Sequence, residues 1–230
     1  MPKSKIIKEL VKDEISLEKA LYRVIVLAKD LKDSKLEQWA KNEINGYDNP
    51  EEIPEYRRVK PFFMGSYVMN GVRYDNSPLP MEFLKEMTPK EQEEFLNYKM
   101  KETILMIEIG KKENKNQMGL SFDPTSIQLF SYGTNIVILS ARMEINRKSL
   151  IEIFSKVKQK ILDILCELED KFGCLDDMDI ADSDDKIKNE AKQNIYNIIM
   201  CDTFNDVEIG DNNTIKDSSF LSKINNKKWI

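Results

Sequence analysis

The sequence predicts an α+β domain in which an N-terminal helical bundle packs with one long C-terminal helix and a small, mostly antiparallel β-sheet. Three observations lead to this prediction. Apolar residues recur at helical spacing through residues 4–45, β-forming runs fill the middle of the chain, and one continuous helical stripe covers residues 149–172. With 230 residues, 41% of them hydrophobic, the chain is long enough for one folded domain with an appendage.

Helices are expected over residues 4–14, 17–31 and 34–45, where apolar side chains stand three and four positions apart. Ser16 is a suitable N-cap for the second of them. Ser34 and Glu37 predict a capping box for the third, because the hydroxyl and the carboxylate can each bond a free backbone N–H. Gly46 then ends that helix, since glycine adopts the left-handed conformation at little cost.

The middle of the chain has the residue pattern of a sheet. Strands are expected near residues 59–68 and over residues 125–130 and 134–145, and Asn70-Gly71 is a typical turn. Residues 136–139 are apolar at every position, which indicates a central strand or one covered by helices.

Two further segments have local signals of their own. Thr88, Pro89 and Glu91 predict a capped helix near residues 89–98. Residues 103–110 fit either a strand or the end of a buried helix.

The clearest element is the helix that follows. Ser149 and Glu152 form a second candidate capping box, and Gly173 ends the apolar stripe. A helix of about 24 residues is about 36 Å long, and its stripe repeats in a near-heptad pattern. Packing against the N-terminal helices is the preferred interpretation, and a seam for self-association is the alternative.

These elements divide the chain into residues 1–175, an α+β domain; 176–194, an acidic linker; and 195–230, a β-like tail. Short strands are not stable alone, so the tail needs a sheet to join, in this chain or in another. It is a candidate oligomerisation segment, and the side chains expected to support this role are Ile199, Val207, Ile209 and Ile215. The acidic linker lacks the central glycine and the twelfth-position glutamate of a calcium loop, so no metal site is expected.

The absence of histidine limits the chemistry. The chain has none, which excludes Ser-His-Asp triads, Cys-His pairs and histidine-based zinc sites. The three cysteines, Cys166, Cys174 and Cys201, match no zinc or disulfide spacing, and a reducing cytoplasm is the simplest setting for them. No cofactor is expected, and the sequence favours a protein that is not an enzyme.

Charge and hydropathy limit the partners. The formal net charge is −5 and no basic stripe is present, so binding of nucleic acid over a broad face is disfavoured. No run of about 18 apolar residues occurs, and the start MPKSKIIKEL does not read as a signal peptide, so no membrane partner is expected.

The stretch WAKNEINGYDNPEEIPEYR joins a helix end to an acidic turn and a Pro-x-Tyr-Arg motif. It resembles the N-terminal signature of the AbiTii domain family of bacterial abortive-infection proteins. The matching residues are Trp39, Glu43, Asn45, Gly46, Tyr47, Pro54, Tyr56 and Arg57. The SPLP loop, the long helix and the β-like tail are also similar to parts of that family. The resemblance implies a role in defence against bacteriophage by abortive infection, and it supplies no catalytic residues.

Glu43, Tyr47, Tyr56 and Arg57 come from the two ends of this stretch, and two interpretations are open. In the structural one, Tyr47 packs on the helix end and Glu43 pairs with Arg57. In the functional one, the four line a cleft with Arg142 from the later strand. Arginine would bind a phosphate or carboxylate through its bidentate fork, and the tyrosines would stack on a ring.

Two classes of function follow. The first is a non-enzymatic sensor or effector that works through protein contacts, as a homo-oligomer or with a phage or neighbouring defence protein. The alternative is a toxin that acts on nucleic acid or nucleotides through a Glu/Tyr/Arg site, with Mg²⁺ as a possible aid.

Overall fold

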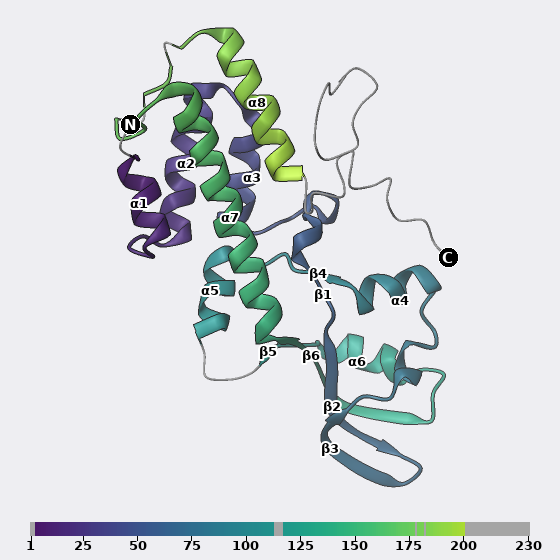
Figure 1. Ribbon diagram of the computed structural model, residues 1–230. Helices are drawn as coiled ribbons and strands as arrows, with labels where there is room; N and C mark the ends of the chain where they lie inside the picture. The colour runs from purple at the N-terminus through teal and green to yellow at the C-terminus, as the bar shows by residue number, and fades with distance from the viewer. Residues whose placement is uncertain (1–2, 113–116, 178, 182, 201–230) are drawn as a thin grey trace, which may run out of the picture. The chain divides into compact units, whose positions relative to one another are not determined.

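The computed structural model describes residues 3–112, 117–177, 179–181 and 183–200, and it confirms the α+β class (Figure 1). The described helices surround a large apolar core, and a small antiparallel sheet has a second core of its own. Among the helices of this part of the chain, none combines the length and the apolar character that crossing a bilayer requires.

The three N-terminal helices are confirmed as α1 (Lys5–Val11), α2 (Leu17–Leu31) and α3 (Ser34–Asn45). Ser16 caps α2 as predicted, because its hydroxyl accepts the N–H of Lys19. The predicted capping box at Ser34 is wrong. Asp33 is the N-cap of α3 instead, and its carboxylate accepts the N–H groups of the next two residues. A charged carboxylate also complements the positive end of the helix dipole, which the Ser34 hydroxyl does not.

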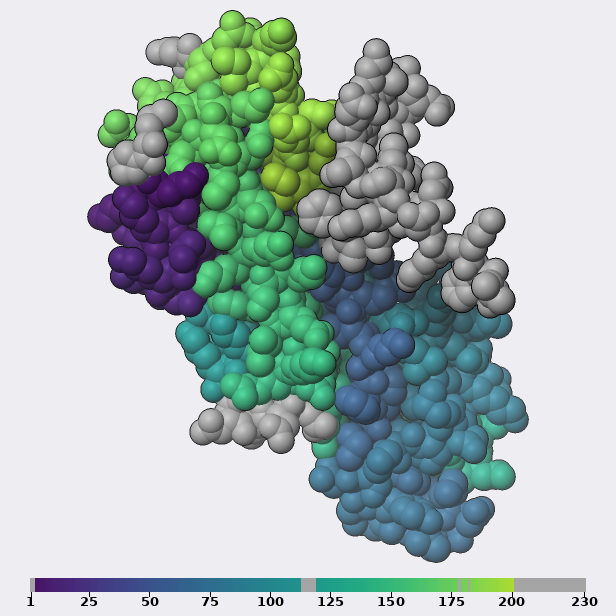
Figure 2. Space-filling view, viewed as in Figure 1, coloured from purple at the N-terminus to yellow at the C-terminus, as the bar shows by residue number. Residues whose placement is uncertain are grey.

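The long helix is α7 (Arg147–Phe172), which ends at Gly173 as predicted. Its capping box at Ser149 is also wrong, because the helix begins earlier and Asn146 caps it through the N–H of Lys148. The apolar stripe of α7 packs against α1, α2 and α5 (Ile104–Lys112), so the interpretation as a core helix is confirmed. Figure 2 shows α1 and α7 side by side at the surface. The segment near residues 103–110 is therefore helical.

Residues 185–200 form a helix, α8 (Asp185–Met200), where the sequence predicts the end of a linker and the start of a β-like tail. Both of those local predictions are wrong. The buried side chains of α8 are Lys188, Ala191, Ile195 and Ile199, which follow the helical period and face α7 and α3. Packing against an apolar surface outweighs the β preference of isoleucine and tyrosine here. Val207, Ile209 and Ile215 lie outside the described residues.

The sheet has the strand order β3-β2-β6-β5, and all neighbouring strands are antiparallel (Figure 1). Its strands are β2 (Phe62–Met69), β3 (Val72–Pro78), β5 (Gln117–Ser121) and β6 (Ile136–Asn146). Asn70 and Gly71 form the predicted turn between β2 and β3, with φ values of 52° and 76° that suit a tight hairpin. The apolar run in β6 does mark a central strand.

The predicted strand over residues 125–130 is a helix, α6 (Pro124–Ser131), and this prediction is wrong. Asp123 caps it by accepting two backbone N–H groups, and Pro124 occupies the first turn, where no N–H is needed. Because Ile127 and Phe130 stand three residues apart, one face of α6 covers the sheet. The helix α4 (Pro89–Leu96) is confirmed, including its capping box at Thr88.

Short elements connect the helices to the sheet. A two-stranded ladder joins β1 (Arg58–Val59) to β4 (Tyr98–Lys99). The single turns η1 (Pro50–Glu52), η2 (Glu55–Arg57) and η3 (Met81–Leu84) complete the order of elements. Tyr98 and Leu120 pack against both apolar cores. The signature stretch thus runs from α3 through η1 and η2 and ends immediately before this ladder.

Candidate functional site

The end of α3 fixes the first half of the signature stretch. Gly46 ends the helix with φ 89° and ψ 172°, a conformation that side chains with a Cβ rarely adopt. A Cβ at this position would lie 2.8 Å from the carbonyl oxygen of Lys101. The next residue, Tyr47, donates its N–H to the same oxygen at 2.9 Å. Glycine therefore lets the chain turn tightly against the segment that follows β4.

The second half of the stretch brings Arg57 to the same place. Met100 donates its N–H to the carbonyl of Arg57 at 2.9 Å, which extends the β1–β4 ladder. The Arg57 guanidinium meets Glu43 at two points, Nε to Oε1 at 3.2 Å and Nη2 to Oε2 at 2.5 Å. Its Nη1 donates to the carbonyls of Met100 and Glu102, at 3.1 and 2.6 Å. Both charged side chains are 0% exposed.

Two tyrosines complete this network. The hydroxyls of Tyr47 and Tyr56 each donate to Oε1 of Glu43 at 2.6 Å. The indole N–H of Trp39 donates to the Tyr56 hydroxyl at 3.0 Å. The Tyr47 ring lies 4.9 Å from the Arg57 guanidinium carbon. The side chains of Trp39, Glu43, Tyr47, Tyr56 and Arg57 are called the signature network below.

The surroundings of the two phenols and of the guanidinium raise the pKa of each of these groups. Burial raises the pKa of both Tyr47 and Tyr56, and the negative charge of Glu43 raises each further. Burial acts to lower the pKa of Arg57, but the charge and hydrogen bonds of Glu43 outweigh it and hold that pKa above its usual value. At neutral pH the phenols are protonated donors and the guanidinium is charged. The phenols and the guanidinium are therefore poor acceptors of a proton from a substrate.

The geometry has the features of the structural interpretation, since the expected pair of Glu43 and Arg57 is present and neither side chain reaches solvent. Four of the five candidate ligand-binding residues come together. Arg142 does not join them, because it lies on β6 and its guanidinium bonds Glu144 at 2.6 Å and Asn76 at 2.5 Å. The sequence flagged the residues of the network, but it missed the two carbonyls that complete the Arg57 bonds.

The network also reaches α8 through a buried lysine that the sequence did not single out. Lys160 of α7 is 5% exposed and donates to the carbonyls of Ile198 and Ile199, at 2.7 and 3.1 Å. Its Nζ lies 5.2 Å from the centre of the Tyr56 ring. A cation at the last turn of a helix is favourable, because it meets carbonyls that lack partners within the helix. Ile199, a candidate oligomerisation residue, is thus buried on its own chain.

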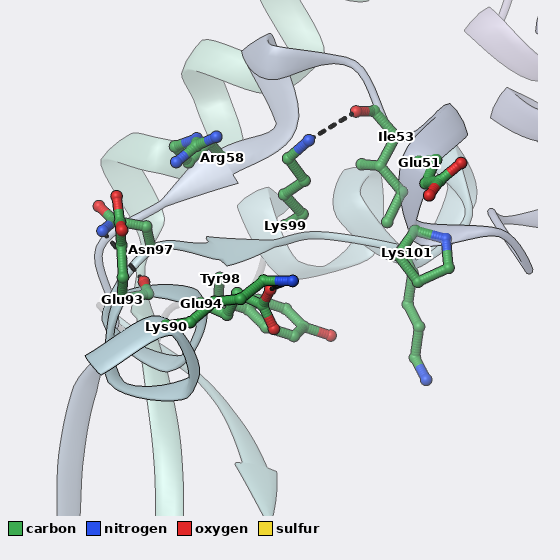
Figure 3. A pocket seen from close by; sticks show the side chains of 11 residues that line it. Glu51, Ile53, Arg58, Lys90, Glu93, Glu94, Asn97, Tyr98, Lys99 and Lys101 are labelled. Carbon is green, nitrogen blue, oxygen red and sulfur yellow. Dashed lines mark hydrogen bonds and ion pairs between the residues drawn. The ribbon is translucent and has the colours of Figure 1, made fainter. Parts of the chain in front are cut away.

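A groove of about 620 Å³ lies beside the network (Figure 3). The acids and bases on its walls belong to α4, η1, the β1–β4 ladder and the segment that follows β4, and they are Glu51, Arg58, Lys90, Glu93, Glu94, Lys99 and Lys101. Figure 3 shows Lys99 directed toward the carbonyl of Ile53, and its Nζ also pairs with Glu55 at 2.9 Å. Arg58 bonds Glu55 as well, so two bases of the groove share one carboxylate.

A smaller hollow of about 290 Å³ lies on the side of Gly46 and Asp48, and Lys101 borders both spaces. It is also lined by Glu102, whose Oε1 accepts the Tyr98 hydroxyl at 3.0 Å. Burial raises the pKa of Tyr98, and the nearby Glu102 carboxylate raises it further. None of the residues that line the groove is among the matching residues of the signature, so no motif could have revealed it. The smaller hollow does include Asn45, Gly46 and Tyr47 of the signature, but the sequence does not show that residues 101–103 lie against them.

The protein therefore has an α+β fold, and its signature residues form a buried network of hydrogen bonds with one ion pair. The chain matches the model of the AbiTii family over residues 4–194, and it therefore belongs to that family of abortive-infection and phage-defence proteins. The matched range contains the whole signature network and the first turns of α8. Comparison with curated proteins and comparison with solved structures gave no match.

Proposed function

We propose that this protein serves abortive infection as a non-enzymatic sensor or effector in the bacterial cytoplasm, through contacts with other proteins and as a homo-oligomer. The observation that carries the proposal is the complete burial of Glu43 and Arg57. These are the two charged residues among the eight that match the family signature, and both are engaged within the protein.

The bonds of Arg57 leave its guanidinium little capacity for a ligand. Nε and Nη2 hold Glu43, and Nη1 holds two backbone carbonyls. A phosphate or carboxylate would have to displace Glu43 and leave a buried charge without a partner, which costs several kcal/mol. The network instead ties α3, η2 and the segment after β4 together. This supports a structural role for the signature residues, and partner proteins would then be recognised by exposed residues elsewhere on the protein.

The tail belongs to the same proposal. Val207, Ile209 and Ile215 remain predicted oligomerisation residues, and residues 195–230 include the last turns of α8. Deletion of residues 201–230 tests their role. A smaller number of chains per particle for the shortened protein in light scattering is the expected result, and an unchanged number of chains would remove the tail from the interface.

The function is tested by expression in a bacterial host with and without phage, with plaque number and culture growth as readouts. Wild-type protein should reduce the plaque number. At an equal amount of folded protein, the variant Tyr56→Phe should protect to the same degree, because it removes one hydroxyl of the network and keeps the ring. Circular dichroism and the amount of folded protein in the cell serve as controls.

Chemistry is tested on purified protein. RNA, DNA and nucleotides, each with and without Mg²⁺, should be recovered unchanged after incubation. Turnover that Tyr56→Phe abolishes in the folded protein would contradict the proposal and would support a toxin with a Glu/Tyr/Arg site.

A further inference from the structure

The two faces of the sheet are in different environments. One face carries Phe63, Tyr67, Ile138 and Met143, which pack with α6 and η3 in the second apolar core. On the opposite face, Phe62, Val137 and Leu139 are 50%, 59% and 48% exposed. Large apolar side chains that cluster on an exposed surface commonly mark a site of protein contact.

The pairing of β2 with β6 places these side chains along one face, with Val137 near one end and Phe62, which pairs with Glu144, at the other. Val68 pairs directly with Val137, and Met64, four residues before Val68 on the same face, pairs with Arg142. We call Phe62, Met64, Val68, Val137 and Leu139 the outer strip. Its members alternate with the buried residues of β2 and β6, so the strip follows both strands along one side of the sheet.

A β-bulge adds Leu139 to this strip. Ser66 pairs with Ser140 while Tyr67 pairs with Ile138, so Leu139 has no partner on β2. Leu139 and Ser140 are consecutive residues and both are exposed. Bulges are local features that redirect side chains, and this one turns a leucine toward solvent in a strand that would otherwise bury every second residue.

The charges beside the outer strip balance. Arg142 pairs with Glu144 at 2.6 Å, and Arg73 pairs with Asp75 at 3.0 Å. Two bases and two acids give these four groups a net charge of zero, which does not attract nucleic acid or a strongly charged partner. In a twofold interface each residue of one copy meets a residue of the same surface on the other, so a face with equal numbers of both signs can complement itself.

The dimensions of the face suit a weak dimer. Eight residues of β2 span about 26 Å, and four strands about 4.8 Å apart give a face of roughly 400–500 Å². Two such faces bury about 800–1,000 Å² together, which is below the range of stable specific interfaces and in the range of weak, transient ones. Association edge to edge is less suited, because the outermost strand β3 carries Arg73, Asp75 and Pro78.

We propose that two copies of this protein associate through the outer strips of their sheets. The inference rests on the proposed function through protein contacts and deepens it by naming the surface and the partner, which is a second copy of the same chain. Leu139 and Val137 form the apolar centre of the contact. The Arg142–Glu144 and Arg73–Asp75 pairs lie at its border and set the register of the two copies.

The association is tested by sedimentation velocity on the full chain over a hundredfold range of micromolar concentrations. Wild-type protein should shift from monomer toward dimer as the concentration rises. Leu139→Asp and Val137→Asp should raise the dissociation constant by at least about tenfold, because each buries an unpaired charge in the contact. The matched control is Val72→Asp, since Val72 is 53% exposed but pairs with Met69, outside the outer strip.

The position of the contact is tested by a photo-crosslinking residue placed at position 137 of the full chain. Adducts should join two copies at β2 or β6. An adduct with residues 201–230 would show that the tail covers this face and would overturn the proposal. Wild-type protein that stays monomeric throughout, or a Val72→Asp variant that dissociates as readily as Leu139→Asp, would also overturn it.

The two proposals fail in different ways. A monomer that still protects against phage would remove the dimer and leave contact with another protein as the function. Turnover of nucleic acid or nucleotides by the purified protein would remove the non-enzymatic function, whatever the state of association.

Discussion

Two arginine–glutamate pairs of this protein have the same chemistry and different surroundings. Arg57 and Glu43 are both 0% exposed and share bonds with two tyrosines and two backbone carbonyls. The side chains of Arg142 and Glu144 are 32% and 10% exposed, and the Arg142 guanidinium has one further partner, Asn76.

The comparison shows how burial decides what an ion pair can do. A buried pair needs every donor and acceptor satisfied, so it holds one geometry and has little capacity left for a ligand. A partly exposed pair contributes little to folding and remains available to a partner. In this protein the pair from the family-like signature serves the fold, whereas the pair without a motif stands on the face proposed for recognition.

The largest effect is expected from breaking the buried pair. Arg57→Ala leaves the buried Glu43 side chain without its ion partner, and it should lower the free energy of unfolding by about 3–5 kcal/mol. Arg58→Ala is the control, because Arg58 is 40% exposed and bonds Glu55 at the surface, and it should cost at most about 1 kcal/mol. Urea unfolding followed by circular dichroism measures both. Equal losses for the two variants would remove the distinction between the buried and the exposed pair.

A smaller effect is expected from the backbone turns of the two regions. Gly46→Ala should cost about 1–3 kcal/mol, because φ is 89° and the new Cβ would meet the Lys101 carbonyl. Gly71→Ala in the sheet hairpin has φ 76° but no atom within 4 Å, so it should cost about 1 kcal/mol. Thermal unfolding compares the two variants. A larger loss of stability for Gly71→Ala than for Gly46→Ala would show that the Lys101 carbonyl does not restrict the residue at position 46.

A third charged contact, made by Glu169, is less buried than the Arg57–Glu43 pair, and its strength depends on pH. Glu169 accepts the hydroxyl and N–H of Ser4 and pairs with Lys3 at 2.7 Å. Although burial acts in the opposite direction, these bonds hold the pKa of Glu169 at about 2, below the ordinary 4.5. Its contribution to stability is therefore complete above pH 4.5 and is lost as the pH falls toward 2.

The variant Glu169→Gln isolates this contribution from that of other carboxylates. The difference in unfolding free energy between wild type and variant should shrink as the pH falls from 6 to about 2. Acid-induced unfolding at a series of pH values measures it. A difference that stays constant over this range would contradict the assigned pKa.

The smallest effect on the monomer is expected at the exposed pair. Arg142→Gln should change the free energy of unfolding by less than about 1 kcal/mol, because the pair is partly solvated. The same variant should weaken self-association, since it removes a charge at the border of the outer strip. Urea unfolding and sedimentation on one preparation check both. If Arg142→Gln lowered the free energy of unfolding as much as Arg57→Ala, Arg142 would be a residue that stabilises the fold.

The sequence correctly predicted the elements that are determined by neighbouring residues in the chain. The periodicity of α2 and α7, the capping box at Thr88 and the Asn70-Gly71 turn are all present. The sequence failed where packing decides. Residues 125–130 and 195–200 are rich in β-forming side chains, but each forms a helix that covers an apolar surface.

The sequence predicted which residues of the candidate site lie together, but it did not predict that they are buried. Glu43, Tyr47, Tyr56 and Arg57 stood out because they flank one loop, and the structure does bring them together. Their burial depends on Met100 and Glu102, which lie more than forty residues further along the chain and carry no motif. A contact between backbone carbonyls and a distant guanidinium leaves no local pattern in a single sequence.

The most direct test plots phage protection against the amount of folded protein in the cell, for variants of the signature network and of the outer strip. The network variants Tyr56→Phe and Arg57→Ala should fall on the line set by wild-type protein at reduced expression, because they act through stability alone. Leu139→Asp should fall below that line at full folding. Network variants that lose protection while folded, with Leu139→Asp on the line, would contradict the account.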